Sequence, residues 1–211
     1  MKKIVLDIPH VQQPANSAMC GAACLEMMYR HFGLQRTMRD VWPVIKKESP
    51  LGCIYCRTAL MAKEAAAQGF TANVVISTDA IAMIESCLEQ NIGIIYLCRK
   101  HPLDKEGHFS AVVGRTYKGI HINDPQLDAA RGANRPVKEA DFLTSLRPFG
   151  EVTSGNTFLL LAPTGTETEQ IELKHQLLPE PCCRSYEAIS AVKPYVLHYL
   201  CHDHDLWFDA L

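Results

Sequence analysis

The sequence predicts an α+β fold in which N-terminal helices pack on an antiparallel sheet. Segments before residue 90 mostly show helical periodicity, whereas the segments from 92 to 161 are largely short apolar runs bounded by turn residues. Helices and strands that are segregated along the chain favour this class over a doubly wound fold. The length of 211 residues suits one domain of ordinary size with room for an appendage.

The opening helix is predicted over residues 16–33. Asn16 or Ser17 can cap its N-terminus, apolar residues recur through it at helical spacing, and Gly33 ends it. Further helices are expected at 37–45, at 57–68, and at 78–90 with Thr78 as the cap.

Short apolar runs predict the strands. Residues 92–98 are continuously apolar, which is typical of a buried strand. Residues 108–113 and 119–123 flank a Lys-Gly turn signal and are expected to pair as an antiparallel hairpin. The remaining elements of this part are strands at 70–76 and 157–161 and a short helix at 138–146.

A polar break at residues 163–169 predicts a domain boundary. We expect one domain at 1–163 and an appendage at 164–211 whose role the sequence leaves open. The appendage is rich in soft metal ligands, but a docking helix anchored by Trp207 and Phe208 is favoured over a metal site, and no metal ion or organic cofactor is predicted. The ligands in question are Cys182, Cys183, His198, Cys201, His202 and His204.

Composition and charge exclude several classes of function. With 21 Lys and Arg against 23 Asp and Glu, the chain lacks the basic footprint of a nucleic-acid-binding protein. Asp7 and Pro9 end the first apolar run well short of a signal peptide, and no run reaches the roughly 20 residues of a membrane helix. Nine irregularly spaced cysteines indicate mostly buried thiols in a reducing compartment. We expect a cytoplasmic protein, or an effector exported by a dedicated machine, of undetermined oligomeric state.

Cys20, His108 and Asp124 form the pattern of a thiol nucleophile with its base. Cys20 lies in the first turn of the predicted opening helix, where free N–H groups and the helix dipole favour a thiolate, and Gly21 would let a substrate backbone approach. His108 begins one strand of the predicted hairpin, and Asp124 follows the other. Paired strands bring these ends together, so the carboxylate can orient the imidazole.

Two further motifs accompany this pattern. Gln13, seven residues before Cys20, could donate its side-chain amide to an oxyanion, and the spacing to Cys20 leaves Gln12 open as the alternative. Cys53 and Cys56 have the spacing of a metal or redox pair, but no second pair stands at zinc-finger spacing and no βαβ unit surrounds them, which favours two ordinary thiols.

The order Gln13, Cys20-Gly21, Gly107-His108-Phe109-Ser110 and Asn123-Asp124-Pro125 resembles the bacteriocin-processing (double-glycine leader) cysteine peptidases of the papain-like superfamily. The resemblance covers about residues 5–163. It implies a papain-like cysteine peptidase fold, with Cys20 as nucleophile, His108 as base, Asp124 as its orienting partner and Gln13 as oxyanion donor. A position just before Cys-Gly that is often acidic or polar in the family holds Met19 here.

The function predicted from these residues is hydrolysis of a peptide or amide bond through a thioester on Cys20. By resemblance, the cleavage site would follow a Gly-rich segment, and the partner is a peptide or protein substrate. One alternative is an acyl or peptidyl transferase of the phytochelatin synthase type, which resolves the same thioester with an amine or thiol. Another is a peptide-binding domain without catalysis, against which the presence of Cys20, His108 and Asp124 argues.

Overall fold

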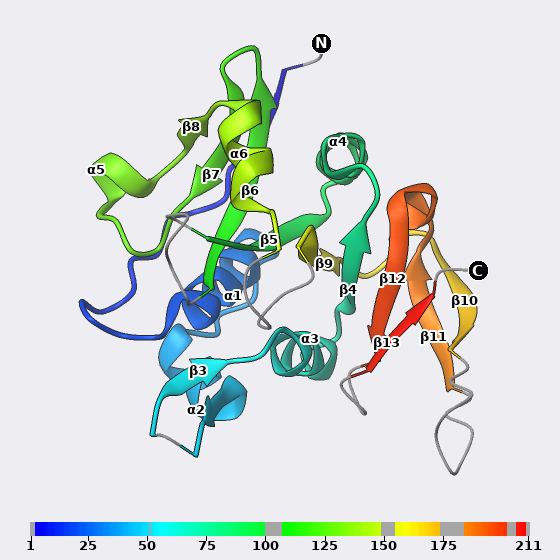
Figure 1. The fold of residues 1–211 in the computed structure, drawn as a ribbon, viewed down its shortest axis with the longest axis horizontal. Helices are drawn as coiled ribbons and strands as arrows, with labels where there is room; N and C mark the ends of the chain where they lie inside the picture. Colours follow the sequence, from blue (N-terminus) through cyan, green and yellow to red (C-terminus); the bar gives the residue numbers. More distant parts are fainter. Residues whose placement is uncertain are drawn as a thin grey trace.

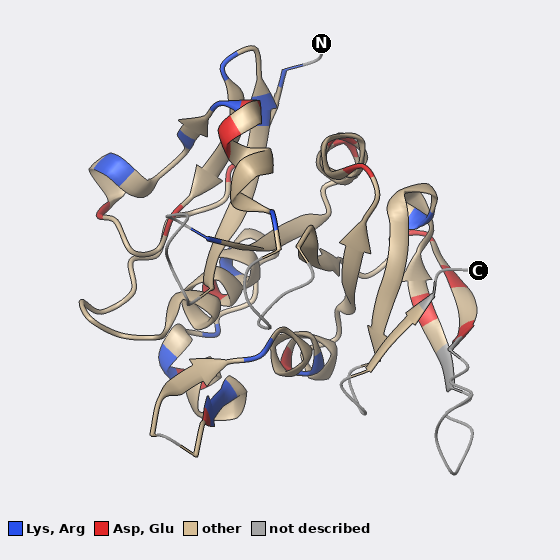
Figure 2. Cartoon of the chain, in the orientation of Figure 1, with Lys and Arg blue, Asp and Glu red and all other residues tan. Residues whose placement is uncertain are grey.

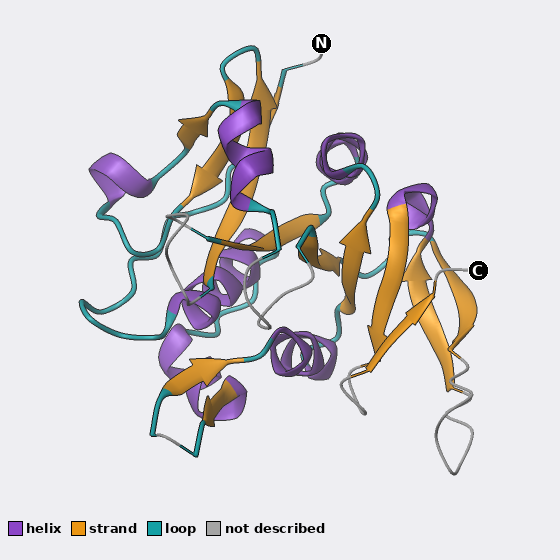
Figure 3. Ribbon diagram, in the orientation of Figure 1, coloured by secondary structure: helices purple, strands orange, loops and turns teal. Residues whose placement is uncertain are grey.

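The computed structural model describes residues 3–50, 52–99, 107–148, 155–173, 184–201 and 206–209. Most of its strands form one antiparallel sheet, and helices cover both faces of that sheet (Figure 1, Figure 3). The strands of the sheet are β1 (Ile4–Val5), β4 (Thr71–Ser77), β5 (Gly93–Cys98), β6 (His108–Thr116), β7 (Gly119–Asn123), β8 (Arg135–Val137), β9 (Thr157–Ala162), β12 (Val196–Cys201) and β13 (Leu206–Asp209).

The strand order across the sheet is β13-β12-β4-β9-β5-β6-β7-β8, and β1 pairs with β6. Two hairpins lie outside it: β2 (Lys46–Glu48) with β3 (Ile54–Cys56), and β10 (Thr168–Leu173) with β11 (Arg184–Ile189). The predicted α+β class with an antiparallel sheet is confirmed. The helices are α1 (Cys20–His31), α2 (Met38–Ile45), α3 (Thr58–Ala67), α4 (Ala80–Glu89), α5 (Ala129–Gly132), α6 (Glu139–Ser145) and the 3₁₀ helix η1 (Ser190–Tyr195).

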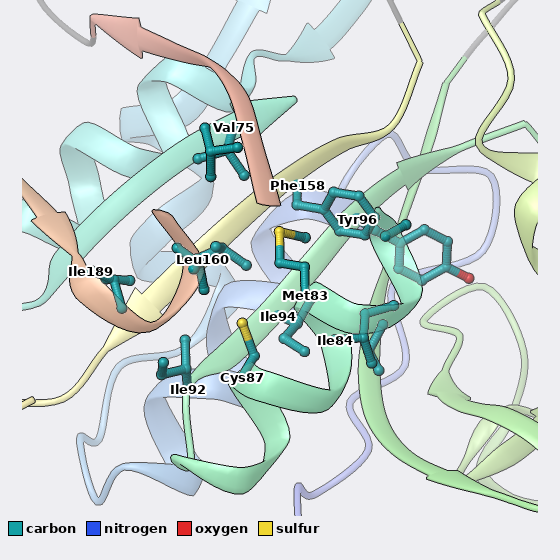
Figure 4. Packing of buried hydrophobic residues seen from close by; sticks show 14 of the residues in the cluster. Val75, Met83, Ile84, Cys87, Ile92, Ile94, Tyr96, Phe158, Leu160 and Ile189 are labelled. Atoms are coloured by element: carbon teal, nitrogen blue, oxygen red, sulfur yellow. The ribbon is translucent and has the colours of Figure 1, made fainter. Parts of the chain in front are cut away.

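The sheet separates two hydrophobic cores, because successive side chains of a strand point to opposite faces. On β5, Ile94 and Tyr96 belong to the core that α4 and α6 cover, whereas Ile95 belongs to the core beneath α1, α2 and α3. Figure 4 shows the first of these cores, with Met83 of α4 directed toward the strands. Cys20 belongs to the second core, so the face covered by α1 to α3 carries it.

Helix α1 begins at Cys20, later than the sequence predicted. Asn16 has a φ of 54°, in the left-handed region, and therefore lies in a turn. The hydroxyl of Ser17 donates to the Pro14 carbonyl at 2.8 Å instead of capping the helix. Met19 occupies the N-cap position and makes no capping hydrogen bond through its side chain, so both predicted caps are wrong. Because the Met19 side chain caps none of them, the first-turn N–H groups of α1 are available to other acceptors.

Asp79, rather than the predicted Thr78, caps α4. The Asp79 carboxylate accepts a hydrogen bond from the Ala82 N–H at 3.0 Å. The Thr78 hydroxyl donates instead to the carbonyl of Tyr195 in η1, at 3.2 Å. A tertiary contact therefore takes the hydroxyl, and the neighbouring carboxylate, an equally good cap, sets the helix start.

The C-terminal segment adds strands to the sheet. β12 pairs with β4 and β13 pairs with β12, both antiparallel. The predicted docking helix is wrong, because Trp207 and Phe208 lie on strand β13. His198 and Cys201 lie on β12, where a separation of three residues puts side chains on opposite faces of the sheet. β12 and β13 thus continue the sheet, while the boundary at residue 163 stays a prediction.

The other suggested tail ligands, Cys182, Cys183, His202 and His204, lie outside the described residues. Across the ranges that are described, no group of three or more His, Cys, Asp or Glu side chains is arranged to hold a metal ion.

Charges of both signs are distributed over the chain. Figure 2 shows Lys and Arg interspersed with Asp and Glu along the elements. None of the described helices is both long and apolar enough to span a membrane.

Asn73 on β4 connects the sheet to the β10–β11 hairpin. Its side chain is fully buried, and its Nδ2 donates to the carbonyl of Glu187 at 2.9 Å. Its Oδ1 accepts a hydrogen bond from the N–H of Ile189, also at 2.9 Å. One amide therefore satisfies two backbone groups of β11.

We expect Asn73→Ala to destabilise the protein by about 1–3 kcal/mol, because it leaves both backbone groups of β11 unsatisfied. Urea unfolding followed by circular dichroism measures this change. Gln35→Ala, which removes an exposed side-chain amide in a loop, is the matched control and should change stability by less than about 0.5 kcal/mol. Equal urea midpoints for the two variants would show that the Asn73 amide does not stabilise the β10–β11 hairpin.

Candidate active site

Cys20 is the first residue of α1, and its exposure is only 9%. Its sulfur accepts a hydrogen bond from the backbone N–H of Phe109 and is hydrogen-bonded to the side chains of Cys56 and His108. The positive end of the α1 dipole lies at the same place. Donors and positive potential therefore converge on one sulfur atom.

His108 and Asp124 lie at the ends of paired strands, as the sequence predicted. His108 is the first residue of β6, and Asp124 directly follows β7. The Nε2 atom of His108 is 2.9 Å from Oδ1 of Asp124, and the side-chain exposures are 12% and 4%. Because the carboxylate accepts at Nε2, the ring nitrogen that remains for the Cys20 sulfur is Nδ1.

The Asp124 carboxylate is fixed by more than its bond to histidine. The backbone N–H of Gln126 donates to Oδ1 at 3.1 Å, and Nη2 of Arg135 lies 3.5 Å from Oδ2. The Asp124 N–H donates to the carbonyl of Gly132 at 3.0 Å. These contacts come from the turn after β7, from α5 and from β8, so a backbone N–H and a guanidinium orient the carboxylate while α5 fixes its backbone.

The N-terminal segment runs along the same turn. His10 donates from Nε2 to the Asp124 carbonyl at 2.9 Å, and the Gln13 N–H donates to the Pro125 carbonyl at 2.8 Å. These two bonds fix the course of the chain shortly before it enters α1. They therefore also fix the position of Cys20 relative to the turn that carries Asp124.

Of the two candidate glutamines, Gln13 is buried and Gln12 is exposed. Gln13 Nε2 donates to the carbonyl of Ser17 at 2.7 Å, within the loop that leads to Cys20. Its Oε1 is buried and has no hydrogen-bond partner among the described residues. Burial and position favour Gln13 over Gln12, while the role of either at an oxyanion stays a prediction.

Cys56 lies beside Cys20, although the two are far apart in sequence. Its Sγ accepts a hydrogen bond from the backbone N–H of Gly21 and would be 2.7 Å from a Cβ placed on that glycine. Met61 Sδ would be 2.8 Å from the same Cβ. The space beside Gly21 is therefore filled by the protein's own sulfur atoms, and the interpretation that this glycine admits a substrate backbone is wrong.

The pKa values of the two thiols are shifted in opposite directions. A hydrogen bond from Cys56, together with the hydrogen bond and charge of His108, holds the pKa of Cys20 well below its ordinary value, although burial acts against this. The contact with Cys20, reinforced by burial, raises the pKa of Cys56 well above its ordinary value. Negative charge is therefore favoured on Cys20, and the proton on Cys56.

The sequence interpretation missed two contributors. His10 belongs to none of the sequence motifs, and no pattern in the sequence links it to the Asp124 carbonyl. Cys56 was noticed for its spacing to Cys53, but Cys53 is exposed and the thiol that Cys56 contacts is Cys20. That contact depends on where the β2–β3 hairpin folds back, which the spacing does not encode.

Comparison with solved structures finds the same fold. A C39-like peptidase from Bacillus anthracis has a TM-score of 0.62 and 16% identity over 77% of this chain and 98% of that one. The peptidase domain of Streptococcus ComA, a bifunctional ABC transporter of quorum sensing, has a TM-score of 0.56 and 16% identity over 74% and 99%. A double-glycine motif protease from an AMS/PCAT transporter, in complex with the leader peptide, has a TM-score of 0.52 and 18% identity over 77% and 100%.

A comparison with curated protein sequences gives no match. The model of the Peptidase_C39 like family matches residues 5–154, which include Cys20, His108 and Asp124. This span is most of the chain, and it agrees with the family that the order of sequence motifs resembles. The chain therefore belongs to the Peptidase_C39 like family of cysteine peptidases.

Proposed function

We propose that the protein hydrolyses a peptide or amide bond through a thioester on Cys20, with His108 as the base and Asp124 as the group that orients it. The observation that carries the proposal is the continuous hydrogen-bonded path from the Asp124 carboxylate through the His108 ring to the Cys20 sulfur. Nucleophile, base and orienting group in hydrogen-bond contact are what this chemistry needs.

The reaction follows from the protonation states in this path. The Cys20 thiolate attacks the carbonyl carbon, forming the S–C bond while the carbonyl π electrons move to oxygen. The intermediate collapses as the C–N bond breaks, and Nδ1 of protonated His108 gives its proton to the leaving amine. Water then adds to the thioester, losing a proton to Nδ1, and Cys20 leaves as thiolate. Asp124 retains its contact with Nε2 throughout and stabilises the imidazolium.

The oxyanion lies at the start of α1. The backbone N–H of Cys20 belongs to the first turn, whose N–H groups have no partners within the helix. Gln13 is the second donor that we assign, since it is buried in the loop that enters α1. Its amide would release the Ser17 carbonyl and turn toward the substrate oxygen.

The proposed substrate is a peptide with small residues before the scissile bond. Cys20 is only 9% exposed, so a reacting carbonyl has to come close to the protein backbone. Glycine makes that approach without a side chain to accommodate. The resemblance to double-glycine peptidases and the solved relative that holds a leader peptide both support this substrate class.

We expect Cys20 to react first when the folded protein is treated briefly with limiting iodoacetamide at about pH 6. An ordinary thiol is protonated there, whereas a lowered pKa keeps a thiol in its reactive form until the pH falls below that lowered value. Peptide mass spectrometry locates the label. Cys53, the exposed thiol among the described cysteines, is the internal control, because accessibility alone would make it react before Cys20. His108→Ala should abolish the preference for Cys20, and labelling dominated by Cys53 would contradict the proposal.

We expect Asp124→Asn to lower kcat/KM for peptide hydrolysis by about 10²-fold or more, because His108 loses the carboxylate that orients it. Asp128→Asn is the matched control: Asp128 lies four residues away, is partly exposed and contacts Arg131. Both variants are checked for folding by circular dichroism. Similar activities in the two folded variants would remove Asp124 from the mechanism.

We expect peptides with Gly-Gly before the scissile bond to be cleaved with a kcat/KM at least about tenfold above that of matched Val-Val peptides, since branched side chains hinder approach to the recessed sulfur. Mass spectrometry of the products, with and without an added amine, distinguishes hydrolysis from transfer. A preference for the Val-Val series would refute the small-residue site, and an amine adduct as the main product would favour the transferase.

A further inference from the structure

Cys56 reaches the nucleophile through the short β2–β3 hairpin. Its pairing with Lys46 fixes the end of β3, and α3 begins two residues later at Thr58. Cys56 is thus held between an antiparallel pair and the start of a helix, at a point where the chain has little freedom. The neighbouring cysteine of the same motif, Cys53, lies before β3 and is exposed.

The Cys56 side chain is fixed against the first turn of α1. Its sulfur accepts the N–H of Gly21 and occupies the space in which a Cβ at that position would lie 2.7 Å away. With the sulfur used as an acceptor in this direction, the S–H hydrogen is left to point elsewhere. The acceptor that it meets is the Cys20 sulfur.

The groups around the pair determine which sulfur carries the proton. His108 and the Phe109 N–H, both from β6, face Cys20 and favour its thiolate. Cys56 faces the Cys20 sulfur on α1, whose negative charge would repel a second thiolate. The arrangement therefore favours a thiolate on Cys20 and a neutral thiol on Cys56.

We propose that Cys56 is a positioning residue of the active site, whose S–H donates to the Cys20 sulfur and holds it as a thiolate next to His108. This inference rests on the proposed role of Cys20 as nucleophile. Cys56 keeps its proton throughout and forms no bond to the substrate. Its hydrogen bond is strongest when Cys20 is negatively charged, before attack and again when the thioester is resolved.

The test is the rate of Cys20 alkylation by iodoacetamide as a function of pH, in wild type, Cys56→Ala, Cys56→Ser and Cys53→Ala. At about pH 6 we expect Cys56→Ala to react at least about tenfold more slowly than wild type, because less of Cys20 is ionised. At about pH 9 the two rates should converge. Cys56→Ser keeps a hydroxyl donor and should follow wild type closely, as should Cys53→Ala.

The shape of the pH profile separates this role from a merely structural one. A loss of packing around Cys20 would lower the rate of Cys56→Ala by a similar factor at every pH, and that result would overturn the proposal. Superimposed profiles of Cys56→Ala and wild type would overturn it as well. Circular dichroism and urea unfolding of each variant establish that folded proteins are being compared.

The alkylation profile and peptide hydrolysis test different statements. If the profile of Cys56→Ala shifts but wild type cleaves no peptide, the positioning role stands and the hydrolytic function fails. If wild type hydrolyses peptides and the profiles coincide, only the role of Cys56 fails. Uniformly slow labelling of Cys20 in acid would overturn the positioning role, because no thiolate would be present to position, and peptide hydrolysis by wild type would decide the proposed function separately.

Discussion

The pairing of β6 with β7 is the constraint on which the site depends. Ala111 pairs with Asn123, and this register brings the first residue of β6 and the residue after β7 to the same end of the hairpin. A slip of one residue would turn the side chains of one strand to the other face and separate His108 from Asp124. β5 and β8 pair with the outer edges of the hairpin and hold that register in place.

Three segments that are distant in sequence then meet at one sulfur atom. α1 supplies Cys20 and its helix N-terminus, the β6–β7 hairpin supplies the imidazole and the carboxylate, and the β2–β3 hairpin supplies a second thiol. Each segment is fixed by its own pairing or packing in the sheet and its two cores. The orientation of the proposed reacting groups is therefore set by folding, which is the basis of preorganisation.

The part of this arrangement that could be predicted from sequence is the part with local signals. Periodicity and turn residues place the helix that carries Cys20 and the hairpin that carries His108 and Asp124, and the ends of a hairpin are neighbours whatever surrounds it. Cap positions were predicted less well, because a tertiary contact to η1 engages Thr78. The contact of Cys56 with Cys20 and the strands of the C-terminal segment result from packing between distant segments, which no local pattern records.

The position of β9 has a consequence for the order of events during protein synthesis. β9 is central, with Leu159 paired to Val74 of β4 on one side and to Ile95 of β5 on the other, yet it follows both strands far along the chain. As the ribosome makes the protein, β5, β6 and β7 can form a local meander early, while β4 has no partner in it. Only when β9 emerges can the two parts join, so they are united by long-range pairing rather than by contacts between neighbouring segments.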